Sequence, residues 1–218
     1  MQNVIGRVQD RHVAWPLSLP ISQAATEVST RQLLRQVALQ LFVEQGFHSV
    51  SLRQLAATMR LQAGSLYNHI ESKQALLFEL IEEHESDLLA LLATQASRRS
   101  NSPLQLETCV RLQLQFNCQH EQRHILARLE FRSLSDEQKL RVVQLRKAQT
   151  LHLENILARC ALPPHECTPM ALGLQALLDG VITGYPGGVR PPLNKLVALF
   201  SRMLLSGLPP EQVAVRNR

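Results

Sequence analysis

The sequence has no paired-cysteine motif and no apolar run long enough to span a membrane. Its four cysteines, at positions 109, 118, 160 and 167, include no CxxC pair. No secretory signal is expected in the first residues. We therefore expect a reduced, cytoplasmic protein with no membrane partner.

Catalytic motifs are also missing. The sequence contains no nucleophile elbow, phosphate-binding loop, HExxH motif or carboxylate pair at catalytic spacing, which argues against an enzyme and against a bound cofactor. Cys160, His165 and Cys167 are soft metal ligands close together, but a zinc site needs at least one more ligand. We expect no metal there, and a metal or redox role for these three residues is the alternative left open.

The composition is that of a globular protein with a basic N-terminal part. Of the 218 residues, 45% are hydrophobic and 19% are charged, and the net charge is +5, which favours an acidic partner without naming it. Residues 29–73 have a net charge of +3, from these side chains: Arg31, Arg35, Arg53, Arg60 and Lys73 against Glu44 and Glu71. A local positive field of this kind supports phosphate binding.

The same part has the pattern of three short helices. Apolar residues from Thr30 recur with the helical period, and Gly46 ends the first helix. Ser51 and Gln54 form a capping box for a second helix, and a third is expected over residues 62–70. Because no strand-length alternating run occurs in the sequence, we predict an all-α fold.

The stretch VALQLFVEQGFHSVSLRQLAATMRLQAGSLYNHIESKQALLFEL resembles the N-terminal domain of the tetracycline-repressor (TetR) family of bacterial transcription regulators. Its most specific piece is GSLYNHI, followed by Ser72-Lys73 and by ALL at the start of the next helix. The resemblance implies a helix-turn-helix DNA-binding domain over residues 29–74 and a helical effector-binding and dimerisation domain over residues 75–218. Residues 1–28 show no helical period and contain Pro16 and Pro20, which predicts a flexible arm.

Nine residues match the DNA-contacting positions of that family. The resemblance places the following residues at the DNA: Ser51, Arg53, Ala63, Gly64, Ser65, Tyr67, Asn68, His69 and Lys73. It implies that Asn68 reads a base, since asparagine can form two hydrogen bonds with adenine, and that Lys73 holds a phosphate. Alternatives remain: Tyr67 in the core, Ser51 as a helix cap alone, and Arg53 and Lys73 merely solvated.

Two residues depart from the family pattern. Arg60 occupies a turn position where glycine is usual, so we expect a non-glycine residue in a left-handed conformation. Gln62 stands where serine or threonine commonly caps the third helix. These differences leave open the turn geometry and any extra phosphate contact by Arg60.

The rest of the chain is expected to be helical. Capping signals and apolar periodicity predict helices over residues 73–96, 102–120, 121–133, 135–160, 168–183 and 194–206. The last of these is apolar around its axis, and the preceding one is also rich in leucine. Such helices must be covered on more than one side, which predicts a homodimer with a four-helix interface.

An effector pocket is expected between the central helices, where apolar and polar side chains mix. The candidates are Leu112, Phe116, Asn117, His120, Leu129 and His152. The alternative is a plain helical core with satisfied histidines. Residues 127–147 loosely resemble regulators of fatty-acid and acyl-CoA catabolism, whose CoA phosphate could meet Arg141, Arg146 and Lys147, although a solvated helix face explains these cations as well.

We therefore expect a ligand-responsive repressor, released from a palindromic double-stranded DNA operator by a small-molecule effector such as an acyl-CoA or another apolar metabolite. The identity of the effector and the choice between repressor and activator stay open. The alternatives are a helical adaptor with degenerate DNA binding and an all-helical enzyme.

Overall fold

The computed structural model describes residues 30–96, 102–160, 162–184 and 191–206. Within these ranges every regular element is a helix, which confirms the all-α prediction. The elements are α1 (Thr30–Gln45), α2 (Leu52–Thr58), α3 (Ala63–Leu66), α4 (Lys73–Ala96), α5 (Ser102–Gln119), α6 (Glu121–Leu129), the 3-10 helix η1 (Phe131–Ser133), α7 (Asp136–Arg159), α8 (Pro164–Thr183) and α9 (Leu193–Ser206). No described helix is long and apolar enough to cross a membrane.

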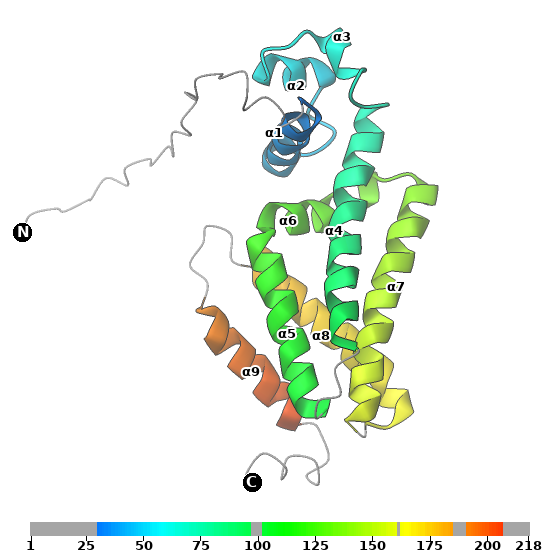
Figure 1. Cartoon of the computed structure of the whole chain (residues 1–218), viewed down its shortest axis with the longest axis vertical. Helices are drawn as coiled ribbons and strands as arrows, with labels where there is room; N and C mark the ends of the chain where they lie inside the picture. Colours follow the sequence, from blue (N-terminus) through cyan, green and yellow to red (C-terminus); the bar gives the residue numbers. More distant parts are fainter. Residues whose placement is uncertain (1–29, 97–101, 161, 185–190, 207–218) are drawn as a thin grey trace, which may run out of the picture.

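The molecule is elongated, with a small head at one end and a larger body at the other (Figure 1). The head consists of α1, α2 and α3. Helix α4 has 24 residues and is about 36 Å long; it leaves the head and runs into the body beside α7. The body is completed by α5, α6, α8 and α9, with α9 packed on α5. A movement of α4 therefore reaches both parts.

Local capping explains three of the helix ends. Gly46, with a φ of 82°, follows the last residue of α1, and Ser51 caps α2 by accepting a hydrogen bond from the Gln54 backbone N–H at 3.1 Å. The predicted capping box is incomplete, since only the Ser51 side chain accepts a bond there, and the Gln54 side-chain amide donates to the Gln45 side-chain oxygen at 2.8 Å. The box at the start of α7, between Ser135 and Gln138, is complete.

The third helix is shorter than predicted. Helix α3 spans only Ala63–Leu66, and hydrogen-bonded turns extend it to Ile70, whose N–H donates to the Leu66 carbonyl. Gln62 provides no side-chain cap, as predicted. An uncapped helix followed by Tyr67, Asn68 and His69, all modest helix formers, has little local reason to be longer.

Three further boundaries differ from the predictions. Helix α6 ends at Leu129, and η1 follows it. Helix α8 begins at Pro164, four residues before the predicted start, because proline is favoured in the first helical position. Asn194 lies inside α9 rather than before it, and its side chain accepts a hydrogen bond from the Lys195 N–H. The predicted arm over residues 1–28 and most of the loops at 97–102 and 185–192 lie outside the described residues.

Two hydrophobic cores share α4. The core of the head joins α1, α2 and α3 to the first two turns of α4 and to Leu126, Ala127, Leu134 and Val142 from α6, α7 and the segment between them. The core of the body packs α5, α7, α8 and α9 around Leu88 and Leu92 of α4. The head is therefore packed directly on one end of the body. The division between residues 74 and 75 stays a prediction.

Candidate nucleic-acid interface

A sharp turn joins α2 and α3 at the tip of the head. The Arg60 N–H donates to the Ala57 carbonyl at 3.0 Å, and the Leu61 N–H donates to the Ala56 carbonyl at 2.8 Å. Between these bonds Arg60 has a φ of 57°, which is the left-handed conformation predicted for this turn. Buried Leu66 then anchors α3 in the core of the head.

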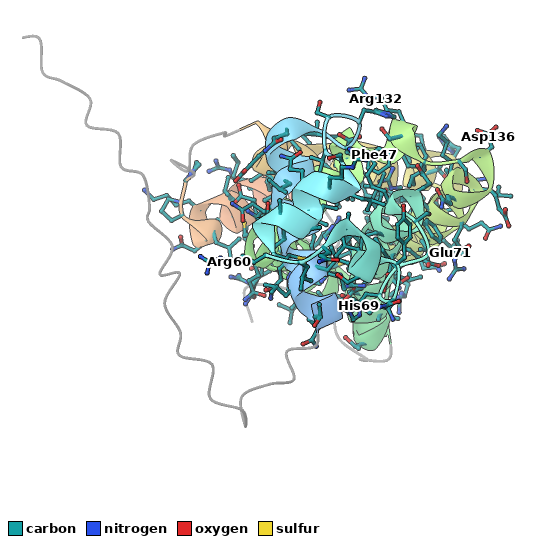
Figure 2. The ribbon with its side chains drawn as sticks, turned by 90° about the horizontal axis from the view of Figure 1, so that it is seen from above. Phe47, Arg60, His69, Glu71, Arg132 and Asp136 are labelled. Carbon is teal, nitrogen blue, oxygen red and sulfur yellow. The ribbon has the colours of Figure 1, made fainter. Side chains whose placement is uncertain are left out.

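The residues expected at the DNA lie on the outside of this unit. Tyr67 is 61% exposed, so its ring does not fill the core. Asn68, Ser51, Arg53 and Gly64 are also exposed. Ala63, Ser65 and His69 are half-buried. Seen from above the head, His69 and Arg60 lie on the end of the molecule that α2 and α3 form (Figure 2).

Two small residues at the start of α3 have different roles within the protein. The Ser65 hydroxyl donates to the Gln62 carbonyl at 2.6 Å. A Cβ atom added to Gly64 would meet no protein atom within 4 Å, so the fold itself does not require glycine there. A missing side chain at this exposed position leaves room for another molecule to approach the backbone.

The Lys73 side chain, at the start of α4, makes contacts within the protein. Its ammonium group donates to the backbone carbonyls of Phe47 at 2.8 Å and Val50 at 2.7 Å, and it lies 4.2 Å from the centroid of the Phe47 ring. Burial lowers the pKa of Lys73, and the charge of Glu130 partly opposes that shift. Two of its three N–H donors therefore hold the loop between α1 and α2.

Fewer cationic side chains of the head are free of acidic partners than the sequence predicts. Arg31 pairs with Glu79 at 2.7 Å, and Arg35 pairs with both Glu79 and Glu83 of α4. These two arginines are thus neutralised within the protein. By contrast, Arg53 and Arg60 are exposed and have no ion pair among the described residues.

The loop between α1 and α2 also contacts the end of α6, which the sequence did not predict. The Glu130 carboxylate accepts hydrogen bonds from the Phe47 backbone N–H at 3.0 Å and from the Ser133 hydroxyl at 2.6 Å. The His48 ring lies 3.2 Å from the same hydroxyl. Glu130 and Lys73 therefore hold this loop from two sides.

The buried polar cluster is a set of four side chains on α4, α5 and α6, and the rings of its two histidines lie 5.6 Å apart. It consists of His84, Gln113, Asn117 and His124, each at most 1% exposed and each with at least one polar atom that lacks a hydrogen-bond partner among the described residues. Burial and nearby arginines lower the pKa of His84 and His124 to about 3, so both rings are neutral at pH 7. Buried polar atoms without partners are unusual, because removing such a group from water costs free energy.

The structure brings only some of the predicted effector residues to this cluster. Asn117 belongs to it, and Phe116 joins it because its ring stacks on His84 at 5.3 Å. His120 lies against Phe116, 4.6 Å between ring centroids. The remaining three stand apart from these contacts: Leu129 is 51% exposed at the end of α6, and Leu112 and His152 are half-buried on α5 and α7.

An acidic side chain borders the cluster from α8. Asp179 pairs with Arg128 at 3.2 Å and lies 3.8 Å from His124. Burial raises the pKa of Asp179 to about 6, against the lowering effect of the Arg128 charge. Sequence reasoning missed His84, His124 and Asp179, because a single polar residue on an otherwise apolar helix face gives no periodic signal.

The cations predicted to meet a CoA phosphate and the possible Cys-His metal site were also located in the structure. Arg141 pairs with Glu82 at 2.7 Å, and Arg146 pairs with Glu85 at 2.7 Å, whereas Lys147 is exposed. Cys160 and Cys167 are buried, but His165 is exposed and lies near Glu166. Within the described ranges, no three His, Cys, Asp or Glu side chains are placed to hold a metal ion.

Comparisons with known proteins agree with this geometry. Residues 34–80 match the family model of bacterial regulatory proteins of the tetR family. The chain is 31% identical over 74 residues to the HTH-type transcriptional repressor DhaR of Mycobacterium sp. (strain GP1), a match that spans 34% of this chain and 37% of DhaR. The chain thus spans little more than a third of the length of this curated relative.

Two solved structures share the fold over most of the chain. A tetR-family regulatory protein from Rhodococcus RHA1 superposes with a TM-score of 0.75 at 20% identity, covering 82% of this chain and 96% of that one. AibR, in complex with isovaleryl coenzyme A and operator DNA, has a TM-score of 0.70 at 17% identity, covering 79% and 96%. Residues 34–80 therefore have the sequence of the N-terminal segment of bacterial regulatory proteins of the tetR family, and the described chain shares the fold of these solved structures.

Proposed function

We propose that the protein is a ligand-responsive transcriptional regulator that binds a roughly palindromic operator in double-stranded DNA as a homodimer and represses transcription. The observation that carries the proposal is the α2–turn–α3 unit with exposed Tyr67 and Asn68, in the segment that matches the family model. The relatives are transcriptional regulators rather than enzymes. Such a regulator acts in the cytoplasm, where the bacterial chromosome lies.

In this proposal α3 enters the major groove. Asn68 reads a base edge, and Tyr67 and His69 contact base edges or phosphates. Ala63, Gly64 and Ser65 allow the backbone to approach the duplex closely. Ser51 and Arg53 contact the sugar-phosphate backbone at the start of α2, and the third donor of Lys73 reaches a phosphate while the other two hold the loop.

Exposed apolar side chains on α8 and α9 support the dimer. Leu172 and Leu177 of α8 and Leu199 and Met203 of α9 are each 42–53% exposed, and an open groove of about 700 Å³ runs along α8 past Met170. Exposed apolar side chains of this kind are removed from water when two copies pair through a two-fold axis. A dimer places its two recognition helices in successive major grooves.

For the effector, we propose the buried polar cluster with Phe116 and His120 beside it. Leu112 on α5 and His152 on α7 stand apart from these contacts and stay sequence-based candidates. The exposed Leu129 has no contact that supports a role. AibR, which shares the fold, binds a ligand and operator DNA, and this supports a ligand site in the body. The ligand must bind the released conformation more tightly than the DNA-bound one, since only differential affinity shifts an equilibrium.

The experiment selects preferred duplexes from a random-sequence library and measures binding by gel shift. We expect Asn68→Ala to lower affinity for the selected duplex by about tenfold, because a good bidentate base contact contributes about 1–3 kcal/mol of discrimination. Tyr67→Ala should also weaken binding, whereas Gln36→Ala, at an exposed position on α1, serves as the control. No salt-dependent DNA binding by the wild type would contradict the proposal and favour the adaptor.

A further inference from the structure

The α2–α3 turn contains an arginine in a conformation that suits glycine. Arg60 is the one non-glycine residue with positive φ among the described residues, at 57°. Side chains are disfavoured there because the Cβ atom approaches the neighbouring carbonyl oxygen, whereas glycine adopts the conformation freely. The two backbone hydrogen bonds of this turn, from the N–H groups of Arg60 and Leu61, would form equally well with glycine.

The Arg60 side chain has no role within the described structure. It is exposed and makes no ion pair there, so nothing in the fold offsets the disfavoured backbone conformation. Strained residues of this kind are concentrated at sites of function. This conformation is therefore a reason to look for a partner of the side chain outside the protein.

The other cationic side chains of the head differ from Arg60 in their partners. Arg31 and Arg35 are paired with acidic residues of α4, and Lys73 is bonded to two carbonyl groups. Arg53 and Arg60 are left as the exposed, unpaired cations on the described part of α1, α2, α3 and their connecting loops. Figure 2 shows Arg60 on the rim of the head, with His69 on the same end of the molecule.

We propose that Arg60 contacts a DNA phosphate beside the groove that receives α3, and that this contact is the reason an arginine stands in the left-handed turn. The proposal rests on the proposed DNA-binding function. A guanidinium group suits the contact because it stays charged and can form two parallel hydrogen bonds with phosphate. The contact is independent of base sequence, so it anchors the head without selecting the operator.

The test measures affinity for a random-sequence 30-base-pair duplex over a range of salt concentrations. Each phosphate contact steepens the plot of log affinity against log salt concentration by about 0.9. Between 1 M and 0.1 M salt, one such contact therefore raises the affinity by an extra factor of about eight. Arg60→Gln should therefore bind about eightfold more weakly per protomer at 0.1 M salt, with a shallower slope. Arg60→Lys should retain the slope.

A second readout separates this role from a structural one. Arg60→Gly should lose DNA affinity as Arg60→Gln does while raising the Tm by about 2 °C, because glycine relieves the turn. Arg159→Gln, which removes the same charge at the far end of α7, is the matched control and should keep the wild-type slope. An Arg60→Gln slope equal to the wild type, or an equal change in Arg159→Gln, overturns the inference while the proposed function stands. A wild type that binds no duplex overturns both.

Discussion

At the residue scale, Lys73 connects the start of α4 to the loop that precedes α2. Its ammonium group bonds the carbonyls of Phe47 and Val50 and lies over the Phe47 ring. Hydrogen bonds from a charged donor are stronger than neutral ones, and half-buried carbonyls left without a donor destabilise the fold. The position of α2 relative to α4 therefore depends on this side chain, whether or not DNA is bound.

We expect Lys73→Met to lower the free energy of unfolding by about 2 kcal/mol, because the aliphatic stem is kept while two charge-assisted hydrogen bonds are lost. Urea denaturation followed by circular dichroism measures the change. The control is Lys139→Met, whose exposed pair with Asp136 at 3.4 Å should contribute less than about 0.5 kcal/mol. Equal stability of the two variants would show that the Lys73 contacts do not hold the loop.

At the scale of elements, α6 connects the buried polar cluster to the head. His124 and Arg128 lie at one side of this helix near Asp179, and Glu130, directly after its last residue, accepts the Phe47 N–H. A ligand that repositions α6 would thus act on the α1–α2 loop directly, as well as through α4. Packed helices transmit such shifts because their interfaces switch between distinct packing arrangements and do not deform continuously.

We expect Glu130→Ala to destabilise the head by about 1–3 kcal/mol, since it leaves the Phe47 N–H without an acceptor. Hydrogen exchange should show faster exchange at the Phe47 amide than in the wild type. Glu130→Gln keeps an acceptor oxygen, so it should retain most of the protection. The same protection in Glu130→Ala as in the wild type would contradict a structural role for this contact.

At the scale of the whole molecule, two cores lie along one long helix and an apolar face remains exposed on α8 and α9. Exposed patches of this type are typical of protein interfaces. A dimer would cover them and would also set the distance between the two heads, which half-site spacing on DNA requires.

Sedimentation should therefore give a dimer for the wild type at micromolar concentration and a monomer for Leu177→Asp, because a buried unpaired carboxylate is costly. Leu177 is 44% exposed on α8, and Leu140→Asp, at a 59% exposed position on α7, is the matched control. Leu177→Asp should also weaken binding to a palindromic duplex. A wild-type monomer would refute the proposed interface.

The features that the sequence determined by itself are those set within a few turns of chain. The predicted long helix over residues 73–96 matches α4, the Ser135–Gln138 box caps α7, and Arg60 has the predicted left-handed conformation. The match of residues 34–80 likewise confirms the family resemblance. Capping, periodicity and turn conformation depend on residues three to five positions apart, so they can be read along the chain.

Only the tertiary structure decided which side chains are available to a partner. Arg35 is paired with Glu79, 44 positions away, the Phe47 N–H bonds Glu130, 83 positions away, and Lys73 bonds two carbonyls of a distant loop. Such partners depend on how helices pack in three dimensions, and a charge or a histidine in the sequence carries no signal of its neighbour across the fold. The net charge of the head could be read from the sequence, but packing determined which of its cationic side chains stay exposed and unpaired.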